Sequence, residues 1–201
     1  MQASQANSDV QSVSVWRAHI RRELVTRRLA TPDDVHARWS AAIDQHLDRL
    51  LGNPGRFKVI GFCWPYKREF DARPLVARLL RDGVRAALPV VVAPHAPLEF
   101  RQWHPDAPME AGAYGIPVPR KMVDATPDVL LLPANGFDSC GYRLGYGGGY
   151  FDRTLPSMSP RPVVIGVSFE LGRLPTIRPE AHDVPLDCIV TEAGAFRTPP
   201  I

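Results

Sequence analysis

The feature that most constrains the fold is a series of short, almost wholly apolar runs separated by helical patterns and turns. Five such runs occupy residues 57–63, 84–93, 128–133, 163–169 and 187–191. Short apolar runs of this kind are typical of strands buried on both faces of a parallel sheet. Because helical patterns alternate with them, we expect an α/β fold: a mostly parallel sheet flanked by helices on both faces, in three α/β/α layers.

The helical patterns are equally short. In residues 13–30, Trp16, Ile20 and Leu24 recur at helical spacing, and an adjacent stripe carries arginines. Thr31 is expected to cap a second helix. This helix has Pro32 in its first position and runs to about Leu51. A third helix is predicted to end at Gly83 and a fourth to begin at Tyr150. Segment 98–103 has the pattern of an edge strand, and 114–119 that of an extended loop.

Length and composition favour one domain. A chain of 201 residues with 45% hydrophobic and 22% charged residues can bury its own core. We expect a single domain over residues 13–201, preceded by a disordered polar tail at residues 1–12. The N-terminus lacks the basic start and apolar core of a signal peptide, and no run of about 18 apolar residues occurs. We therefore expect a cytoplasmic protein without a membrane partner.

The charge balance argues against one class of partner. There are 24 basic and 21 acidic residues, a net charge of +3, which does not favour a nucleic-acid partner. Nearly all the basic residues are arginines, whose planar fork of donors suits small anions. The three cysteines (63, 140 and 188) form no CxxC pair, so neither a zinc site nor a disulfide framework is indicated, and Cys140 is expected to be inert.

The most informative segment is a glycine loop at residues 143–153. It has four glycines in five positions, followed by a helix start, so its backbone N–H groups could hold a phosphate. Its spacing matches neither the P-loop nor the dinucleotide fingerprint, and by glycine count alone a purely structural turn is equally consistent. Arg143 could neutralise phosphate, Asp152 could bind Mg²⁺, and Tyr146 and Tyr150 could stack on a flat ligand.

Five ordered segments resemble the motifs of one family. They are the pair Arg17 and Arg21, WPYKREFD at 64–71, YGIPVP at 114–119, RLGYGGGYFD at 143–152 and HDVPLDCIVTE at 182–192. Together they are similar to 5-formyltetrahydrofolate cyclo-ligase, also called 5,10-methenyltetrahydrofolate synthetase, from residue 16 to 192. The resemblance implies cyclisation of 5-formyltetrahydrofolate with ATP and Mg²⁺, releasing ADP and phosphate. Gly148 departs from members that carry Lys there.

The resemblance also implies roles for individual residues. The reduced folate would contact Trp64, Glu69 and residues 146–150, Mg²⁺ would bind Asp152 and Asp183, and Arg143 and Tyr150 would take part in catalysis. A carboxylate such as Glu69 can accept two hydrogen bonds from a pterin ring. ATP would contact Arg17, Ala18, His19, Ile20, Arg21, Arg143, Leu144, Gly145, Tyr146, Gly147, Gly148, Gly149, Tyr150 and Phe151.

Several alternatives remain open at this point. The arginine stripe (Arg17, Arg21, Arg28) could be a solvated helix face, Trp64 a core aromatic, and Asp183 a turn cap. His182 is expected to be structural. The protein could also be a paralogue that binds nucleotide in another small-molecule pathway, or a non-catalytic nucleotide-binding module. We expect it to act as a monomer.

Overall fold

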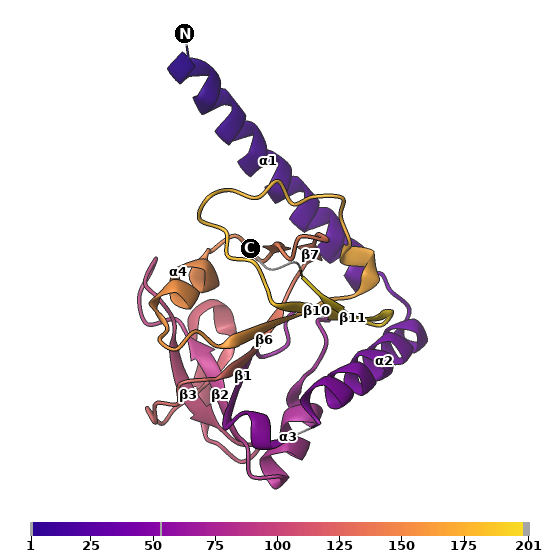
Figure 1. Cartoon of the computed structure of the whole chain (residues 1–201), viewed down its shortest axis with the longest axis vertical. Helices are drawn as coiled ribbons and strands as arrows, with labels where there is room; N and C mark the ends of the chain where they lie inside the picture. Colours follow the sequence, from indigo (N-terminus) through magenta and orange to yellow (C-terminus); the bar gives the residue numbers. More distant parts are fainter. Residues whose placement is uncertain (1, 53, 199–201) are drawn as a thin grey trace.

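The structure, a computed structural model, describes residues 2–52 and 54–198, apart from the side chains of residues 2–12 and Pro54. A seven-stranded sheet lies at its centre, in the order β11-β10-β9-β6-β1-β2-β3 (Figure 1). The strands from β10 to β2 run parallel, and β3 and β11 are antiparallel edges. Their bounds are β1 (Val59–Phe62), β2 (Arg85–Val90), β3 (Glu99–Trp103), β6 (Val129–Pro133), β9 (Val163–Val167), β10 (Cys188–Thr191) and β11 (Gly194–Arg197).

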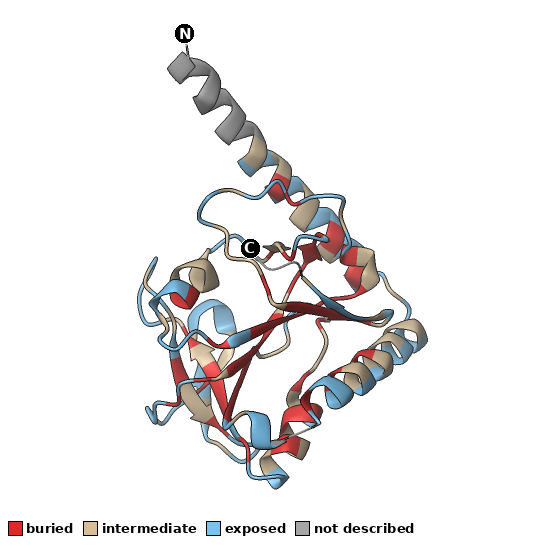
Figure 2. Cartoon of the chain, viewed as in Figure 1, coloured by how far each residue is buried: buried red, intermediate tan, exposed pale blue. Residues whose placement is uncertain are grey.

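Helices cover both faces of this sheet. On one face, α2 (Asp33–Leu51) packs against β10 and β11 and α3 (Arg73–Arg81) packs against β2, while the short α4 (Tyr150–Ser157) packs Leu155 on the opposite face (Figure 1). The central strands β1, β6, β9 and β10 are almost wholly buried, the edge strand β11 is largely exposed, and the helices expose their outer sides (Figure 2). The predicted fold class, a mostly parallel sheet flanked by helices, is confirmed.

Two small hairpins extend from the main sheet. β4 (Met109–Ala111) pairs with β5 (Pro117–Pro119) around the 3₁₀ turn η2 (Ala113–Gly115), and β7 (Gly136–Phe137) pairs with β8 (Arg143–Leu144). Two further 3₁₀ turns are η1 (Pro54–Arg56) and η3 (Glu170–Gly172). Part of the segment predicted as an extended loop, 114–119, is therefore a strand. Neither these hairpins nor β11 was predicted, because strands of two to four residues leave too little alternation to detect.

The first helix, α1, spans Gln2–Leu29 and projects beyond the sheet (Figure 1). It begins well before Val13, so the structure continues the helix through most of the segment predicted as a disordered tail, residues 1–12. That segment contains neither Gly nor Pro, and nothing in it stops a helix. The side chains of residues 1–12 lie outside the described part of the chain.

The start of α2 also differs from the prediction. Pro32 occupies the cap position and no side chain caps the helix. The Thr31 hydroxyl donates instead to the carbonyl oxygen of Arg27, at 3.2 Å, and so serves the end of α1. Among the helices that the structure describes, none is long and apolar enough to cross a membrane.

The order of the strands determines where a ligand can bind. The chain leaves β1 through α3 toward β2, and it leaves β6 through α4 toward β9 on the other face. Because β1 and β6 are neighbours, their connections diverge and a crevice opens beyond their carboxyl ends. Ligands of open α/β sheets bind at such a switch point.

Close packing around β1 generates the first prediction. A Cβ added at Gly61 would overlap the side chain of Leu130 and lie 2.8 Å from Pro127 Cγ. We expect Gly61→Ala to lower the free energy of unfolding by about 1–3 kcal/mol through overpacking. Guanidinium denaturation measures this. Gly145→Ala is the matched control, because nothing lies within 4 Å of its added Cβ, and an equal loss in both variants would contradict the prediction.

Candidate functional site

A cleft of about 500 Å³ lies at the carboxyl ends of β1 and β6. Its walls come from α1, the segments that follow β1 and β6, the β4–β5 hairpin and the glycine loop. Segments far apart in the sequence thus meet at the switch point. Most residues predicted to bind ligands line it: Arg17, Arg21, Trp64, Glu69, Arg143, Gly145, Tyr146, Gly147, Gly148, Gly149, Tyr150, Phe151, Asp152 and Asp183.

Four residues predicted to contact ATP do not line the cleft. Ala18 and His19 face solvent on α1, Ile20 is half-buried, and Leu144 is buried in the protein interior. They are neighbours in sequence of residues that do line the cleft. On a helix or strand, adjacent side chains point in different directions, which accounts for the separation.

Glu69 and Tyr146, both predicted to contact the folate, are in direct contact. The Tyr146 hydroxyl donates to Glu69 Oε1 at 2.8 Å, and the backbone N–H of Tyr66 donates to Glu69 Oε2 at 3.0 Å. Arg28 donates to the Tyr146 oxygen at 2.9 Å and lies 3.9 Å from Glu69 Oε1. The site therefore contains a buried acid held by three neighbouring donors.

Burial shifts the ionisation of this group. Loss of water raises the pKa of Glu69 above its usual value, although Arg28 and the hydrogen bonds from Tyr146 and Tyr66 act in the opposite direction. Burial and the nearby Glu69 also raise the pKa of Tyr146. Burial raises the pKa of the Cys63 thiol as well, and this disfavours the thiolate form that a nucleophilic cysteine needs.

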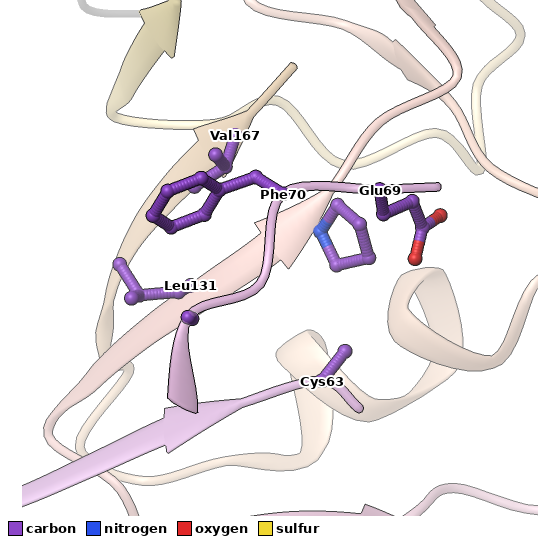
Figure 3. A pocket seen from close by; sticks show the side chains of 7 residues that line it. Cys63, Glu69, Phe70, Leu131 and Val167 are labelled. Atoms are coloured by element: carbon purple, nitrogen blue, oxygen red, sulfur yellow. The ribbon is translucent and has the colours of Figure 1, made fainter. Parts of the chain in front are cut away.

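A second, smaller cavity of about 20 Å³ lies beside Glu69. Its lining is largely apolar: Phe70, Leu131 and Val167 lie together on one side, whereas the Glu69 carboxylate points away from them (Figure 3). Apolar surroundings on one side of a carboxylate reduce its contact with water. Glu69 as a whole is 7% exposed, and this burial is the cause of its raised pKa.

Arg17 is fixed by several partners on one segment of the chain. Its guanidinium donates to Asp183 Oδ2 at 2.6 Å and to the Ile177 carbonyl at 3.1 Å, and it lies 3.3 Å from Glu180 Oε2. Arg17 is 5% exposed and Arg28 3% exposed. The alternative that these arginines form a solvated helix face is therefore wrong for both.

Arg21, the next arginine on α1, is less completely paired. Its Nε is buried and has no hydrogen-bond partner among the described residues. Burial and the neighbouring Arg17 lower the pKa of Arg21, although Asp183 acts to raise it. A Cβ at Gly147 would lie 3.4 Å from Arg21 Nη1. An unpaired guanidinium beside a glycine backbone can receive an anion.

The two carboxylates predicted to bind Mg²⁺ are each paired with an arginine. Asp152 Oδ1 accepts from Arg143 at 3.1 Å and from the Val184 backbone at 3.2 Å. Asp183 accepts from Arg17 and, at 2.7 Å, from the backbone N–H of Glu180. Asp183 thus also closes a turn, which is the alternative role considered for it. Burial would raise its pKa, but Arg17 and the Glu180 N–H outweigh this and hold the pKa of Asp183 below its usual value.

Two glycines of the loop need their special conformation. Gly147 has φ of +93° and Gly149 has φ of +62°, a region that side-chain-bearing residues rarely adopt. Arg153 donates to the Gly148 carbonyl at 2.5 Å and stacks on the Tyr150 ring at 5.2 Å. The Tyr150 and Tyr114 hydroxyls lie 3.2 Å apart, which joins the loop to the β4–β5 hairpin.

Trp64 fills both roles considered for it. It lines the cleft and also packs against the core on the α2 and α3 side of the sheet. The guanidinium of Arg73 stacks on its ring at 4.5 Å from the centroid. His182, predicted to be structural, is largely exposed at the cleft and lies 3.9 Å from Asp183.

Three residues of the site were missed as candidates from the sequence: Arg28, Tyr66 and Asn135. Asn135 is buried, and its side-chain oxygen accepts from Arg28 at 2.9 Å. A signal for Arg28 existed: positions 17, 21, 24 and 28 share one face of a helix, and Leu24 on that face is apolar. No pattern marks Asn135, which is placed only by the end of β6.

Comparison with known proteins bears on the family and on the fold. The sequence profile of the 5-formyltetrahydrofolate cyclo-ligase family matches residues 13–192. The chain belongs to this family. The resemblance described from its motifs is confirmed, as is the enzyme class that the family name denotes, a cyclo-ligase.

Individual relatives agree with this membership. A 5-formyltetrahydrofolate cyclo-ligase of Mycolicibacterium smegmatis is 30% identical over 184 residues, covering 87% of this chain and 93% of its own. That of Escherichia coli K12 is 35% identical over 135 residues, covering 64% and 74%. The solved structure of Aquifex aeolicus 5,10-methenyltetrahydrofolate synthetase superposes with a TM-score of 0.79 at 26% identity, covering 92% and 94%.

The lowered pKa of Asp183 generates a prediction about pH. A carboxyl group whose pKa is lower in the folded than in the unfolded protein stabilises the fold at pH values above its unfolded pKa, 3.8. That contribution disappears as the pH falls through its folded pKa. We expect Asp183→Asn to lower the free energy of unfolding at pH 7 by about 1–2 kcal/mol, since the pair is partly open to solvent.

Denaturant titrations over a range of pH check this. The difference in free energy of unfolding between the wild-type protein and Asp183→Asn should stay constant down to about pH 5 and shrink as the pH falls below 3.8. A difference that grows on acidification would contradict the Arg17–Asp183 pairing as its source.

Proposed function

We propose that this enzyme converts 5-formyltetrahydrofolate to 5,10-methenyltetrahydrofolate at the cleft described above, with consumption of ATP in the presence of Mg²⁺ and release of ADP and phosphate. One observation carries the proposal: a buried acid suited to a pterin and a glycine loop suited to phosphate meet through Tyr146 in one cleft. The family membership supports the same reaction.

Glu69 and Trp64 form the proposed folate end of the cleft. The Glu69 carboxylate has two oxygens at the cleft wall and can accept adjacent N–H donors from a pterin ring. Trp64 offers a flat apolar surface, and Tyr66 and Tyr146 lie with their rings 5.5 Å apart beside it in the lining. Stacking and paired hydrogen bonds together would orient the reacting nitrogen atoms of the folate.

Arg17, Arg21 and Arg143 form the proposed nucleotide end. The unpartnered Arg21 Nε and the two left-handed glycines make the chain's own residues a good fit for a polyphosphate. ATP, when bound, supplies the phosphoryl group that turns the formyl oxygen into a leaving group. The arginines would hold the transferring phosphoryl group and neutralise the charge on the departing phosphate.

Asp152 and Asp183 fit the chemistry of Mg²⁺, which prefers carboxylate oxygens and shares them with phosphate. To bind the ion, each carboxylate would give up its arginine partner. The released arginine would then contact the phosphate. In this arrangement Arg143 would act directly on the reacting groups. Tyr150, whose hydroxyl faces Tyr114 across the cleft, would close the site over the substrate.

The direct test mixes the purified protein with 5-formyltetrahydrofolate and MgATP and follows the absorbance of the methenyl product. We expect product and one phosphate released for each molecule formed. Asp152→Asn keeps the shape of the side chain but removes its charge. It should lower kcat by about 10²–10³-fold, while the melting temperature falls by no more than about 2–4 °C, because Arg143 keeps its bond to the Val184 carbonyl. If the wild-type protein forms no product at saturating MgATP, the proposed function is wrong.

Glu69→Gln separates folate binding from nucleotide binding. Gln keeps the size of the side chain and offers one acceptor oxygen in place of two. We expect the affinity for 5-formyltetrahydrofolate, measured by isothermal titration calorimetry, to fall by about 10- to 100-fold, while the rise in melting temperature caused by MgATP stays unchanged. Nucleotide stabilisation without any folate binding by the wild-type protein would favour the paralogue alternative instead.

A further inference from the structure

Arg28 is a buried cation whose donors reach three separate segments of the chain around the cleft. Its Nε donates to the Lys67 carbonyl at 2.9 Å, its Nη1 to Asn135 Oδ1 at 2.9 Å and its Nη2 to the Tyr146 hydroxyl at 2.9 Å. Nη2 also lies 3.9 Å from Glu69 Oε1. One guanidinium on α1 therefore joins the segment after β1, the segment after β6 and the glycine loop.

The segment held by Arg28 is conformationally strained. Lys67 and Arg68 have φ of +49° and +59°, so two consecutive side-chain-bearing residues adopt the left-handed region. Such residues persist only where their surroundings hold them. Arg28 binds the Lys67 carbonyl, and the His36 ring lies 3.0 Å from the Arg68 carbonyl. Glu69 follows directly, so the strained turn determines where its carboxylate lies.

The carboxylate itself depends on Arg28 in a second way. Glu69 is 7% exposed, and its apolar neighbours oppose a negative charge. Arg28 is the cation within ion-pair distance of Glu69 among the described residues, and it also fixes the oxygen of Tyr146, which donates to Glu69. Removing the guanidinium would take away the donor to the Lys67 carbonyl and leave the Glu69 charge without its cation.

We propose that Arg28 is a positioning residue for substrate recognition: it holds the 66–69 turn and the Glu69–Tyr146 pair in the geometry that binds the reduced folate. The proposal rests on the proposed function for its ligand. Arg28 does not line the cleft, so it acts through Glu69 and Tyr146 and not by touching the substrate. Its fork of donors, which Lys lacks, is what spans the three acceptors.

The test compares Arg28→Met and Arg28→Lys with the matched controls Arg27→Met and Arg27→Lys, because Arg27 is exposed on the same turn of α1. We expect both Arg28 variants to lower the affinity for 5-formyltetrahydrofolate by about 10- to 100-fold, since a buried network loses a central member. The MgATP-induced rise in melting temperature should remain within error of wild type, and the Arg27 variants should match wild type in both measurements.

A double-mutant cycle tests whether Arg28 acts through Glu69. In the Glu69→Gln background, Arg28→Met should weaken folate binding further by less than about 3-fold, because the interaction is already lost. Equal weakening in both backgrounds, wild-type folate affinity in the Arg28 variants, or a parallel loss of nucleotide binding would overturn the proposal. If Arg28→Met does not fold, Arg28→Lys decides.

Hydrogen exchange on the protein without added ligand tests the proposal even if the wild type binds no folate. That result would contradict the proposed function but not the positioning role of Arg28. The N–H groups of Tyr66 and Glu69 close the turn, donating to Glu69 Oε2 and the Tyr66 carbonyl. We expect Arg28→Met to lose at least about 10-fold of protection at these two amides, with the strand amides of β1 and β6 unchanged. Unchanged protection at the turn would refute the positioning role.

Discussion

The structure of the cleft depends on buried arginines that attach α1 to the rest of the protein. Of the α1 side chains that the structure describes, the buried ones are Arg17, Leu24 and Arg28. Taking a guanidinium out of water is costly unless its donors are satisfied and its charge is paired. Arg17 meets Asp183 and Glu180, and Arg28 meets Tyr146, Asn135 and the Lys67 carbonyl. Polar contacts, and not an apolar stripe, therefore hold α1 in position as one wall of the site.

This arrangement means that the charges of the ligand-free cleft already largely neutralise one another. Arg17 pairs with Asp183 and Arg143 with Asp152, and these are the arginines and carboxylates proposed for phosphate and Mg²⁺. A polyphosphate alone would draw an arginine away from its carboxylate and leave the carboxylate without a counter-charge. A cation alone would draw the carboxylate away and leave the arginine without one. If the proposed sites are right, metal and nucleotide together would replace both partners at once. The geometry therefore favours joint binding over binding of either one.

The parallel strands of the main sheet could be predicted from the sequence because they are continuous apolar runs, whereas the cleft could be predicted only in part. Gly145–Gly149 and Asp152 were found because glycine spacing and charge are visible locally, and Glu69 through its motif. For Arg28 the sequence offered only the alternative of a solvated helix face, because charge normally marks the exposed side of a helix. Its burial depends on acceptors at Lys67, Asn135 and Tyr146, which lie 39, 107 and 118 positions away and meet it only in the folded chain.

Tyr146 links the two proposed ligand sites through a single side chain. Its backbone belongs to the glycine loop, between the open Gly145 and the left-handed Gly147, while its hydroxyl is held between Arg28 and Glu69. A shift of the loop toward a bound nucleotide must either carry the Tyr146 ring along or break its bond to Glu69. Breaking the bond would strip a buried carboxylate of a donor, which is costly. The loop is therefore expected to keep its position when a nucleotide binds, so that the bond between Tyr146 and Glu69 stays intact at the proposed folate end of the cleft.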